Sequence, residues 1–593
     1  MLNPLPRVVM LAFAVALTAA RPADAAELKG EALLADGGTA ATLVGESAAT
    51  RSLVDVDGQS FAKAVTVDVH RKPGGEYEVQ LTQPLRGGLA VGDVLLTTLW
   101  ARMIATPDES NEGRFGIVLE DGKDRLVQRV FGVGNAWQRF DVPVVVDEAH
   151  AAGKVRLNLR AGYYVQSLQF GGISVQRFPA GTAMSGLPNT RPTYAGREPD
   201  AAWRRDAAQR IDKLRKGALK IEVVDAAGRP VADAAVHVRM TRHAFAFGSV
   251  YSANLIAGPD AGTPAAAAYR KKFLQLFNTG VDELKQKWPW WEDVAHRKPA
   301  IDSVAWMREH GVDVRGHVMV WPSWRKTPPS LKALANDPDK LRQQVADHIA
   351  EIGGTFKGQF TEWDVVNEPI MNNDLLKILG ENVMAEWFRL ARQADPDARL
   401  YLNEAGVPNS IPGDAKYDKL YRNIEIIQNA GGPIGGIGMQ GHFGWTMNSP
   451  TQLLAIYDRF SKFGLPIRLT ELDIEVSDPA LQYDYMRDVL TATFSHPNVN
   501  GILNWSFWAG ASWKPKAALF DEAWQPTAAG RAWTDLIHRD WWTDAKGATG
   551  VDGTFACRAF LGEYQVDVQA GGQTKTATTS LKSAGQTVRI QTN

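Results

Sequence analysis

Short β-like runs alternate with amphipathic helical stretches between residues 243 and 540, and this alternation restricts the possible folds more than any other feature of the chain. Parallel strands need a crossover connection, usually a helix, so the pattern predicts a parallel sheet covered by helices. Eight such units over roughly 300 residues predict an α/β fold, a (β/α)8 TIM barrel with its chemistry at the carboxyl ends of the strands. The strand-like runs are Phe245–Val250, a weaker one near Asn278, Val312–Trp321, Glu362–Glu368, Arg399–Asn403, Ile437–His442, Ile467–Ile474 and Ile502–Phe507.

The segment before the barrel is rich in β-like patterns. Residues 27–180 contain runs that alternate with period two, such as Val65–Val69 and Val155–Arg160, separated by glycine pairs and Asp-Gly steps. This pattern predicts an N-terminal β-sandwich. Residues 181–218 are expected to form a linker that contains proline and glycine, followed by an amphipathic helix.

Two short β segments flank the barrel. Residues 219–242 predict a β-hairpin with its turn at Asp225–Pro230, and residues 544–593 contain further short strands but few large apolar side chains. An isolated hairpin and a segment of about 50 residues are both marginally stable in water. We therefore expect the two segments to form one small β-sandwich beside the barrel.

The first 25 residues have the pattern of an export signal peptide. Arg7 precedes an apolar run, Val8–Ala20, and Ala23-Asp24-Ala25 provides the small residues of a cleavage site. A retained N-terminal anchor is the alternative, although 13 apolar residues are too few to span a bilayer. The prediction is a secreted or periplasmic protein without a membrane span. Cys557 is the only cysteine, so we expect no internal disulfide and assign this residue to packing.

Composition excludes one class of partner and suggests another. The 65 Lys and Arg residues balance 66 Asp and Glu residues, which gives no electrostatic reason to expect nucleic-acid binding. Of the 19 tryptophans, 16 lie between Trp288 and Trp542. An apolar core rarely needs so many rings with a polar N–H edge, whereas a cleft that binds flat ligands does.

Two of the strand-like runs carry a glutamate near their carboxyl ends. Glu368 ends the fourth run, within Trp363-Asp-Val-Val-Asn367-Glu368-Pro369, and Glu471 lies in the seventh, within Leu469-Thr-Glu471-Leu-Asp473. A carboxylate that leaves an apolar strand needs a partner or a function, because an unpaired buried charge is costly. Structural salt bridges are the alternative to catalysis.

Through these two motifs the barrel region resembles the family 10 glycoside hydrolases, which are typified by endo-β-1,4-xylanases. The resemblance implies a retaining glycosidase in which Glu368 is the general acid/base and Glu471 is the nucleophile. It also implies that Asn367 binds the 2-hydroxyl of the reacting sugar, and that no metal or other cofactor takes part. From the residues alone, His317 and His442 suggest a metal, but no third ligand has a spacing suited to zinc.

Further residues match the family on the third and sixth strands. Gly316-His317-Val-Met-Val-Trp321 resembles the third strand, where the histidine and the tryptophan contact the sugar at the point of cleavage. Gln440 and His442 resemble the sixth-strand pair, in which the histidine orients the nucleophile. The resemblance therefore implies that all four side chains lie in the substrate site.

Matches also occur after the second and eighth strands. Lys287, in Lys287-Trp288, matches a lysine that reaches sugar hydroxyls, and Trp505 and Trp513 match two tryptophans that cover the glycone subsites. The resemblance thus implies a polysaccharide or oligosaccharide substrate.

The N-terminal sandwich resembles a carbohydrate-binding module. The resemblance rests on Ala136–Phe140 and Leu168–Val175. Two interpretations remain open for its aromatic residues, a sugar-stacking platform and ordinary packing. These residues are Trp100, Trp137, Tyr163 and Tyr164.

Three positions depart from the pattern of xylan-cleaving members. Leu284 stands where the family has an asparagine that binds the distal sugar, Pro322 where it commonly has histidine, and Ala405 where it usually has a tyrosine. Leucine cannot replace an amide as a hydrogen-bond partner, so the distal subsites are expected to differ. We expect the aromatic residues without a family counterpart to compensate by stacking; these are Trp290, Trp291, Trp324 and Trp445.

Three functions remain open at this point. The first is a retaining endo-β-glycanase that hydrolyses a β-1,4-linked plant-type polysaccharide, with xylan as the expected substrate. The second uses the same mechanism on another β-linked, branched or acidic polysaccharide. The third is a non-catalytic carbohydrate-binding protein that keeps the barrel as a scaffold.

Overall fold

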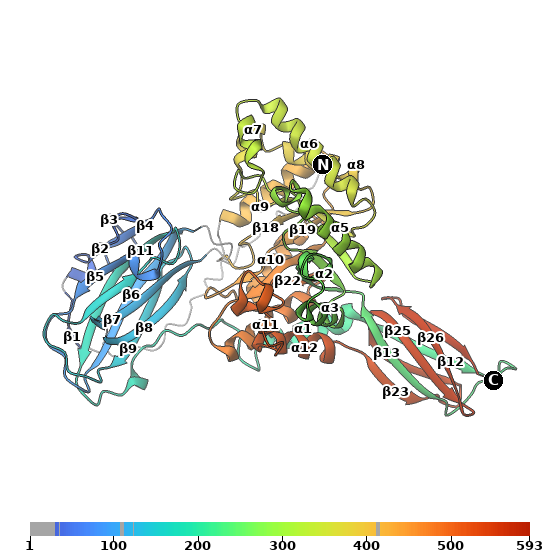
Figure 1. The fold of residues 1–593 in the computed structure, drawn as a ribbon. Helices are drawn as coiled ribbons and strands as arrows, with labels where there is room; N and C mark the ends of the chain where they lie inside the picture. The colour runs from blue at the N-terminus through green and yellow to red at the C-terminus, as the bar shows by residue number, and fades with distance from the viewer. Residues whose placement is uncertain (1–29, 35, 107–111, 123, 411–414, 593) are drawn as a thin grey trace, which may run out of the picture.

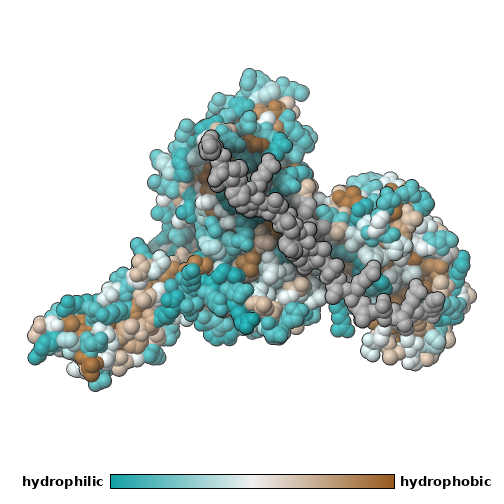
Figure 2. Space-filling model, turned by 180° about the vertical axis from the view of Figure 1, so that it is seen from behind, coloured by the Kyte–Doolittle hydropathy of each residue, from teal (hydrophilic) through white to brown (hydrophobic). Residues whose placement is uncertain are grey.

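The computed structural model describes residues 30–34, 36–106, 112–122, 124–410 and 415–592. The predicted export signal, residues 1–25, lies outside the described residues. Two β modules lie on opposite sides of a central barrel (Figure 1). Figure 2 shows the molecule from behind, with hydrophilic residues over much of the visible surface of the barrel. In the described part of the chain, no helix has both the length and the apolar character needed to cross a bilayer.

The predicted TIM barrel is confirmed. Eight parallel strands form a closed ring in the order β14-β15-β16-β17-β18-β19-β21-β22, and β22 pairs with β14. The short strand β20 (His442–Phe443) pairs with the carboxyl end of β21. The ring strands are β14 (Ala246–Tyr251), β15 (Thr279–Asp282), β16 (Asp313–Val320), β17 (Glu362–Asn367), β18 (Arg399–Glu404), β19 (Gly436–Met439), β21 (Ile467–Ile474) and β22 (Val499–Asn504).

Helices cover the barrel, and several of them begin at residues suited to cap a helix. Asp337 accepts a hydrogen bond from the backbone N–H of Lys340, and Ser449 forms a capping box with Gln452. The helices are α2 (Ala253–Ala257), α3 (Pro264–Leu276), α4 (Trp288–Trp291), α5 (Val294–Glu309), α6 (Pro338–Thr355), α7 (Asp374–Leu379), α8 (Val383–Ala394), α9 (Ala415–Asn429), α10 (Pro450–Ser461), α11 (Pro479–Ser495) and α12 (Ala528–Asp535).

The N-terminal module is a sandwich of two antiparallel sheets. One sheet has the order β3-β4-β11-β6-β9, with β1 on β11, and the other has the order β2-β5-β10-β7-β8. Phe115, Phe131, Phe140 and Phe170 pack against one another between the sheets. The strands are β1 (Glu31–Ala32), β2 (Thr42–Val44), β3 (Ala49–Asp55), β4 (Lys63–Val69), β5 (Gln80–Pro84), β6 (Val94–Ala105), β7 (Gly113–Asp121), β8 (Asp124–Val133), β9 (Gln138–Val145), β10 (Arg156–Arg160) and β11 (Ser167–Phe178).

The second β module combines strands that precede the barrel in the sequence with strands that follow it. The two strands expected to pair as a hairpin lie in different sheets, so the prediction of a hairpin is wrong. β12 belongs to the sheet β24-β12-β27, and β13 belongs to the sheet β23-β13-β25-β26. Each strand therefore pairs with C-terminal strands instead of its neighbour in sequence. The strands are β12 (Lys216–Val224), β13 (Ala235–His243), β23 (Asp544–Ala548), β24 (Thr554–Phe560), β25 (Gly562–Ala570), β26 (Gln573–Leu581) and β27 (Gln586–Gln591).

The two β modules differ in how they join the barrel. The buried side chains of the C-terminal module and those of the barrel form one continuous hydrophobic cluster. The N-terminal sandwich has a core of its own. Helix α1 (Ala202–Arg215), which follows that sandwich, packs on α11, with Trp203 and Ala207 against Ala492.

Candidate active site

Glu368 follows the carboxyl end of β17, and Glu471 lies in the carboxyl-terminal half of β21. Glu368 directly follows β17 and has φ of 52°, a left-handed backbone conformation that non-glycine residues rarely adopt. Its backbone N–H donates to the carbonyl of Asn403 at 2.8 Å. Both glutamates are buried, with 4% and 3% of their surface exposed. Strained backbone of this kind is held by surrounding contacts and is typical of functional sites.

Amide side chains hold the carboxylate of Glu368. Gln440 Nε2 donates to Oε1 at 2.8 Å, Asn367 Nδ2 donates to the same oxygen at 3.2 Å, and Asn372 Nδ2 donates to Oε2 at 2.9 Å. These donors come from three different segments of the barrel rim. They fix the orientation of the carboxyl group.

Glu471 has a more positive environment. Asn403 Nδ2 donates to Oε1 at 2.9 Å, and His442 Nε2 lies 3.2 Å from Oε2. Burial by itself would raise the pKa of Glu471, but the hydrogen bond from His442 and the positive fields of His317, His442 and Lys287 hold it below its ordinary value. Glu471 is therefore ionised at neutral pH.

His442 is held in its charged form. Its Nδ1 lies 2.7 Å from Asp473 Oδ2, and Lys514 Nζ lies 3.4 Å from the other oxygen of Asp473. Burial lowers the pKa of His442, but the charge of Asp473 and the hydrogen bonds to Asp473 and Glu471 raise it to about 10. A protonated imidazole donates from both ring nitrogens, so His442 connects the two carboxylates.

One hydrogen-bond network joins the two glutamates. Asn403 Nδ2 donates both to Glu471 and to Asn367 Oδ1, each at 2.9 Å. Asn367 in turn donates to Glu368, and Gln440 contacts both Asn367 and Glu368. The shared hydrogen bonds therefore fix the positions of the two carboxylates relative to each other.

A buried ion network lies below the site. Arg315 forms ion pairs with Asp364 and with Glu362, and Arg468 also pairs with Glu362. Asp364 Oδ2 accepts from His317 Nδ1 at 2.9 Å. Burial by itself would raise the pKa of Asp364, but Arg315 and His317 hold it below its ordinary value. The network orients His317 toward the cleft side of the barrel.

The predicted aromatic residues surround these groups. Trp505 contacts His317 edge-on, with ring centroids 5.4 Å apart, and Trp321 lies 6.2 Å from the same imidazole. Trp513 contacts His442 at 4.8 Å and is one of the exposed large side chains. Lys287 Nζ lies 5.3 Å from the centre of the Trp321 ring. The structure thus brings all ten predicted site residues into one region.

Three buried polar atoms of this region have no protein partner among the described residues. They are His317 Nε2, Trp321 Nε1 and Gln440 Oε1. Buried polar groups normally have a partner, because an unpaired group costs about 1–3 kcal/mol. Sugar hydroxyls both donate and accept hydrogen bonds, so they could pair with the imidazole nitrogen, the indole N–H and the amide oxygen alike.

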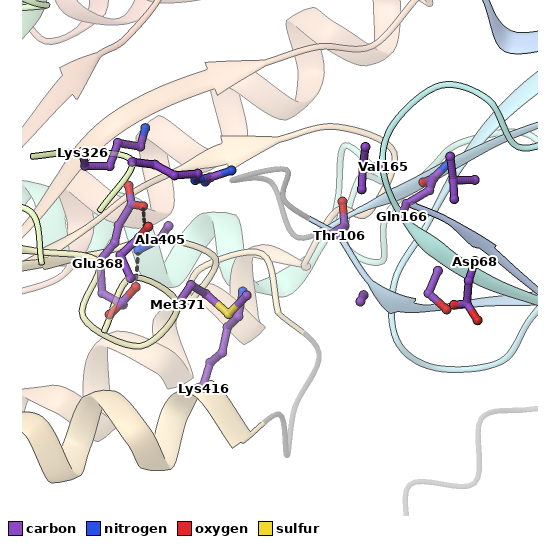
Figure 3. Close-up of a pocket in the computed structure, with 15 residues that line it drawn as sticks. Asp68, Thr106, Val165, Gln166, Lys326, Glu368, Met371, Ala405 and Lys416 are labelled. Atoms are coloured by element: carbon purple, nitrogen blue, oxygen red, sulfur yellow. Dashed lines mark hydrogen bonds between the residues drawn. The ribbon is translucent and has the colours of Figure 1, made fainter. Parts of the chain in front are cut away.

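A cavity of about 390 Å³ lies beside Glu368, between the barrel and the N-terminal sandwich. In Figure 3, Lys326, Glu368, Met371, Ala405 and Lys416 of the barrel face residues of the sandwich across it. The sandwich residues labelled there are Asp68, Thr106, Val165 and Gln166. The cavity also receives Arg325, Asn372 and Glu404 from the barrel.

Sequence reasoning missed several members of the site. Asn403, Asn372 and Asp473 all contact a group that the sequence had singled out. Asp473 lies two residues after Glu471 on the same strand, and the period of two places both on one face. Asn403 lies opposite Asn367 near the end of β18, which pairs with β17, so its proximity also had a signal. Asn372 lies in a loop, where no periodic pattern predicts the position of a side chain.

Two of the four tryptophans expected to stack on substrate have other roles. Trp291 is 1% exposed and packs in the core beneath Arg297. Trp445 packs against Phe131 of the N-terminal sandwich, with ring centroids 5.0 Å apart. The expectation is wrong for these two residues, because the sequence does not show which module an aromatic ring faces.

Comparisons with known proteins identify relatives of this chain. The anti-sigma-I factor RsgI6 of Acetivibrio thermocellus is 30% identical over 383 residues, which cover 63% of this chain and 47% of that protein. Endo-1,4-beta-xylanase 1 of Arabidopsis thaliana is 27% identical over 365 residues, covering 61% of this chain and 37% of that protein. The chain thus spans less than half the length of these two curated relatives.

A solved structure and a family model each match half of the chain. The crystal structure of native xylanase 10B from Thermotoga maritima is 26% identical, with a TM-score of 0.46, and the match covers 50% of this chain and 96% of that one. Residues 239–536, half of the chain, match the family model described as glycosyl hydrolase family 10. The chain therefore belongs to glycosyl hydrolase family 10.

Proposed function

We propose that the chain is a retaining endo-β-1,4-glycanase, with xylan as its substrate. The observation that carries the proposal is that two buried carboxyl groups lie in one hydrogen-bond network and that one of them is held in its ionised form. His442, His317 and Lys287 all favour the ionised form of Glu471, and the amides of Asn403 and Asn367 connect it to Glu368. An ionised carboxylate can act as a nucleophile while its neighbour carries the proton.

In the proposed first step, a carboxylate oxygen of Glu471 bonds to the anomeric carbon as the glycosidic C–O bond breaks. Glu368 gives its proton to the leaving oxygen, which departs as a hydroxyl. This step consumes the charge of Glu471, so Glu368 becomes more acidic. In the second step Glu368 takes a proton from water, the water oxygen bonds to the anomeric carbon, and the bond to Glu471 breaks.

The remaining site residues have supporting roles in the proposal. Asn367 binds the 2-hydroxyl of the reacting sugar, and Gln440 positions Asn367 and Glu368. His442 orients Glu471. Lys287 and His317 bind hydroxyls, and tryptophans enclose the sugar rings; these are Trp321, Trp505 and Trp513.

Alanine variants of the two glutamates test the proposal. Glu471→Ala and Glu368→Ala should each remove most hydrolysis of an aryl β-xylobioside. Added azide should restore turnover appreciably only in Glu368→Ala, with a β-glycosyl azide as the product. In that variant no base activates water, and azide can attack the glycosyl-enzyme without one. Glu381→Ala is the control, since Glu381 is an exposed residue paired with Arg422. Full activity of either active-site variant would refute the proposal.

A second substrate is favoured by the charges at the cavity. Three cations, Arg325, Lys326 and Lys416, line it beside the carboxyl groups of Asp68, Glu368 and Glu404. Acidic side groups of a polysaccharide would pair with these cations. Incubation with xylans, acid-substituted xylans, glucans and mixed glycans, with masses of the products as readout, separates the two substrates. No product from any glycan would instead favour a non-catalytic binding protein.

The site of action is proposed from the N-terminal sequence alone. Polymeric xylan is found outside the cell, and the export pattern of residues 1–25 fits a secreted or periplasmic enzyme. Size analysis of the protein in culture medium and periplasmic extract tests this.

A further inference from the structure

The N-terminal sandwich has a specific contact with the barrel. The buried carboxylate of Glu112 accepts the backbone N–H of Trp445 at 3.0 Å and also that of Thr446. Phe131 packs edge-on against the Trp445 ring, and Arg114 lies 3.8 Å from Glu475. A carboxylate with two backbone donors and an aromatic contact fixes the orientation of two surfaces.

The segment between the sandwich and α1 is also held at both ends. Thr190 exchanges hydrogen bonds with Asp141 of β9, donating its N–H at 2.8 Å and accepting at 2.7 Å through Oγ1. Tyr194 is buried, and its hydroxyl donates to Asp488 of α11 at 2.8 Å. Arg197 pairs with Asp484 of the same helix at 2.9 Å. The segment is therefore not a free tether, and the sandwich has one preferred position.

In this position the sandwich faces the acid/base residue. The cavity beside Glu368 is lined from the sandwich by the ends of β4, β6 and β11 and by the loop before β11 (Figure 3). Val165 of that loop lines the cavity and is 39% exposed, so its side chain is accessible to a group that enters the cavity. Gln166 is rigid, because its side-chain amide is bonded to the backbone of Arg114 and Ala161.

The position of Glu368 decides which part of a substrate would enter the cavity. A general acid lies beside the oxygen that it protonates, so the leaving part of the glycan is on its side. We infer that the N-terminal sandwich forms one wall of the leaving-group end of the cleft, and that the cavity binds the sugars released in the first step. The inference rests on the proposed glycanase function. Under it, the sandwich is part of the active site and not a separate sugar-binding module.

A blocking substitution tests the inference. Val165→Trp would fill the cavity from the sandwich side without substituting any residue of the barrel. The matched control is Val145→Trp, because Val145 is a valine of the same sandwich, 45% exposed, that does not line the cavity. Ala105→Trp is a second blocking variant, at the end of β6. Thermal denaturation of the full chain checks that each variant folds.

The readout compares two substrates that place very different groups on the leaving side. Xylohexaose places several sugars there, whereas 4-nitrophenyl β-xylobioside places only a nitrophenol. The ratio of kcat/KM for the hexaose to that for the aryl glycoside should fall by about tenfold or more in Val165→Trp and Ala105→Trp, and stay within about twofold in Val145→Trp. Cleavage of the hexaose should also move toward its reducing end.

The possible outcomes separate the inference from the function on which it rests. A ratio and a product pattern in both blocking variants equal to those of Val145→Trp would overturn the inference, with the glycanase proposal intact. If the wild-type chain hydrolyses neither substrate, the proposed function itself is wrong.

Discussion

Replacing Asp473 with asparagine should move the acid limb of the pH–activity profile to higher pH. Asp473 lies 2.7 Å from His442, and that imidazole lies 3.2 Å from the proposed nucleophile Glu471. Burial lowers the pKa of His442, but Asp473 and Glu471 raise it to about 10. Asparagine has no charge, so burial gains influence and the pKa of His442 falls toward or below neutrality. Lys514, which also pairs with Asp473, adds a positive field that disfavours the imidazolium further.

The size of the shift in the acid limb follows from the loss of the positive charge of His442 beside Glu471. Two unit charges about 4 Å apart attract by about 1 kcal/mol in water and about 4 kcal/mol at an effective dielectric constant of about 20. One pKa unit corresponds to about 1.4 kcal/mol. The pKa of Glu471 should therefore rise by about 1–3 units when His442 becomes neutral. The nucleophile must be ionised, so a higher pKa of Glu471 means activity is lost at a higher pH.

The assay is kcat/KM on an aryl β-xylobioside between about pH 4 and about pH 8, where this parameter reports the free enzyme. The control is Asp544→Asn, which removes the acid of another His–Asp pair, since Asp544 lies 2.6 Å from His237 Nε2 in the C-terminal module. Its profile should match that of the wild type. An acid limb in Asp473→Asn that stays in place or moves to lower pH would refute the reasoning.

Three further predictions concern stability and docking. Burial raises the pKa of Glu404 from 4.5 to about 7; stability tied to this group is present at low pH and decreases by about 3 kcal/mol as pH rises through this range. Glu404→Gln should remove that part of the decrease in urea denaturation, and an unchanged pH dependence would contradict it. Arg315→Met leaves Glu362 without one of its two buried cations and should cost about 3–5 kcal/mol in the same assay; a loss below about 1 kcal/mol would contradict it. Glu112→Ala leaves the N–H of Trp445 unpaired, which costs about 1–3 kcal/mol. Limited proteolysis should then release the sandwich faster than in the wild type. An equal rate of release would show that Glu112 does not hold the sandwich on the barrel.

Much of the fold could be predicted from periodicity. Alternating β and helical patterns predict a parallel barrel, because each parallel strand needs a crossover and short connections place consecutive strands side by side. Even the weak strand near Asn278 is present, as β15. The hairpin at Asp225–Pro230 was wrong for a different reason. A turn signal shows where the chain reverses, but not that the two strands share a sheet, and β12 and β13 pair with strands more than 300 residues away.

The candidate site was predictable where side chains leave barrel strands. Glu368 and Gln440 directly follow strands, Glu471 lies in the carboxyl-terminal half of its strand, and the closed ring brings these positions together. The contribution of the sandwich was not predictable. It depends on Glu112 meeting the backbone of Trp445, a contact between residues 333 apart in sequence that no local pattern encodes.

The tryptophan cluster divides between two roles. Trp363, Trp387 and Trp533 are fully buried and belong to the core, whereas Trp290 and Trp513 are among the exposed large side chains. Composition alone therefore overstated the aromatic lining of a cleft, since large rings also fill the space between barrel and helices.

The central claim is that Glu471 forms a covalent bond with the sugar. A 2-deoxy-2-fluoro β-xylobioside with a good leaving group slows the second step more than the first, so the glycosyl-enzyme should accumulate. Peptide mass analysis should then find one added disaccharide on the peptide that contains Ile467–Ile474, at Glu471, with loss of activity in proportion. A label on any other carboxylate, or inactivation without a label, would contradict the account.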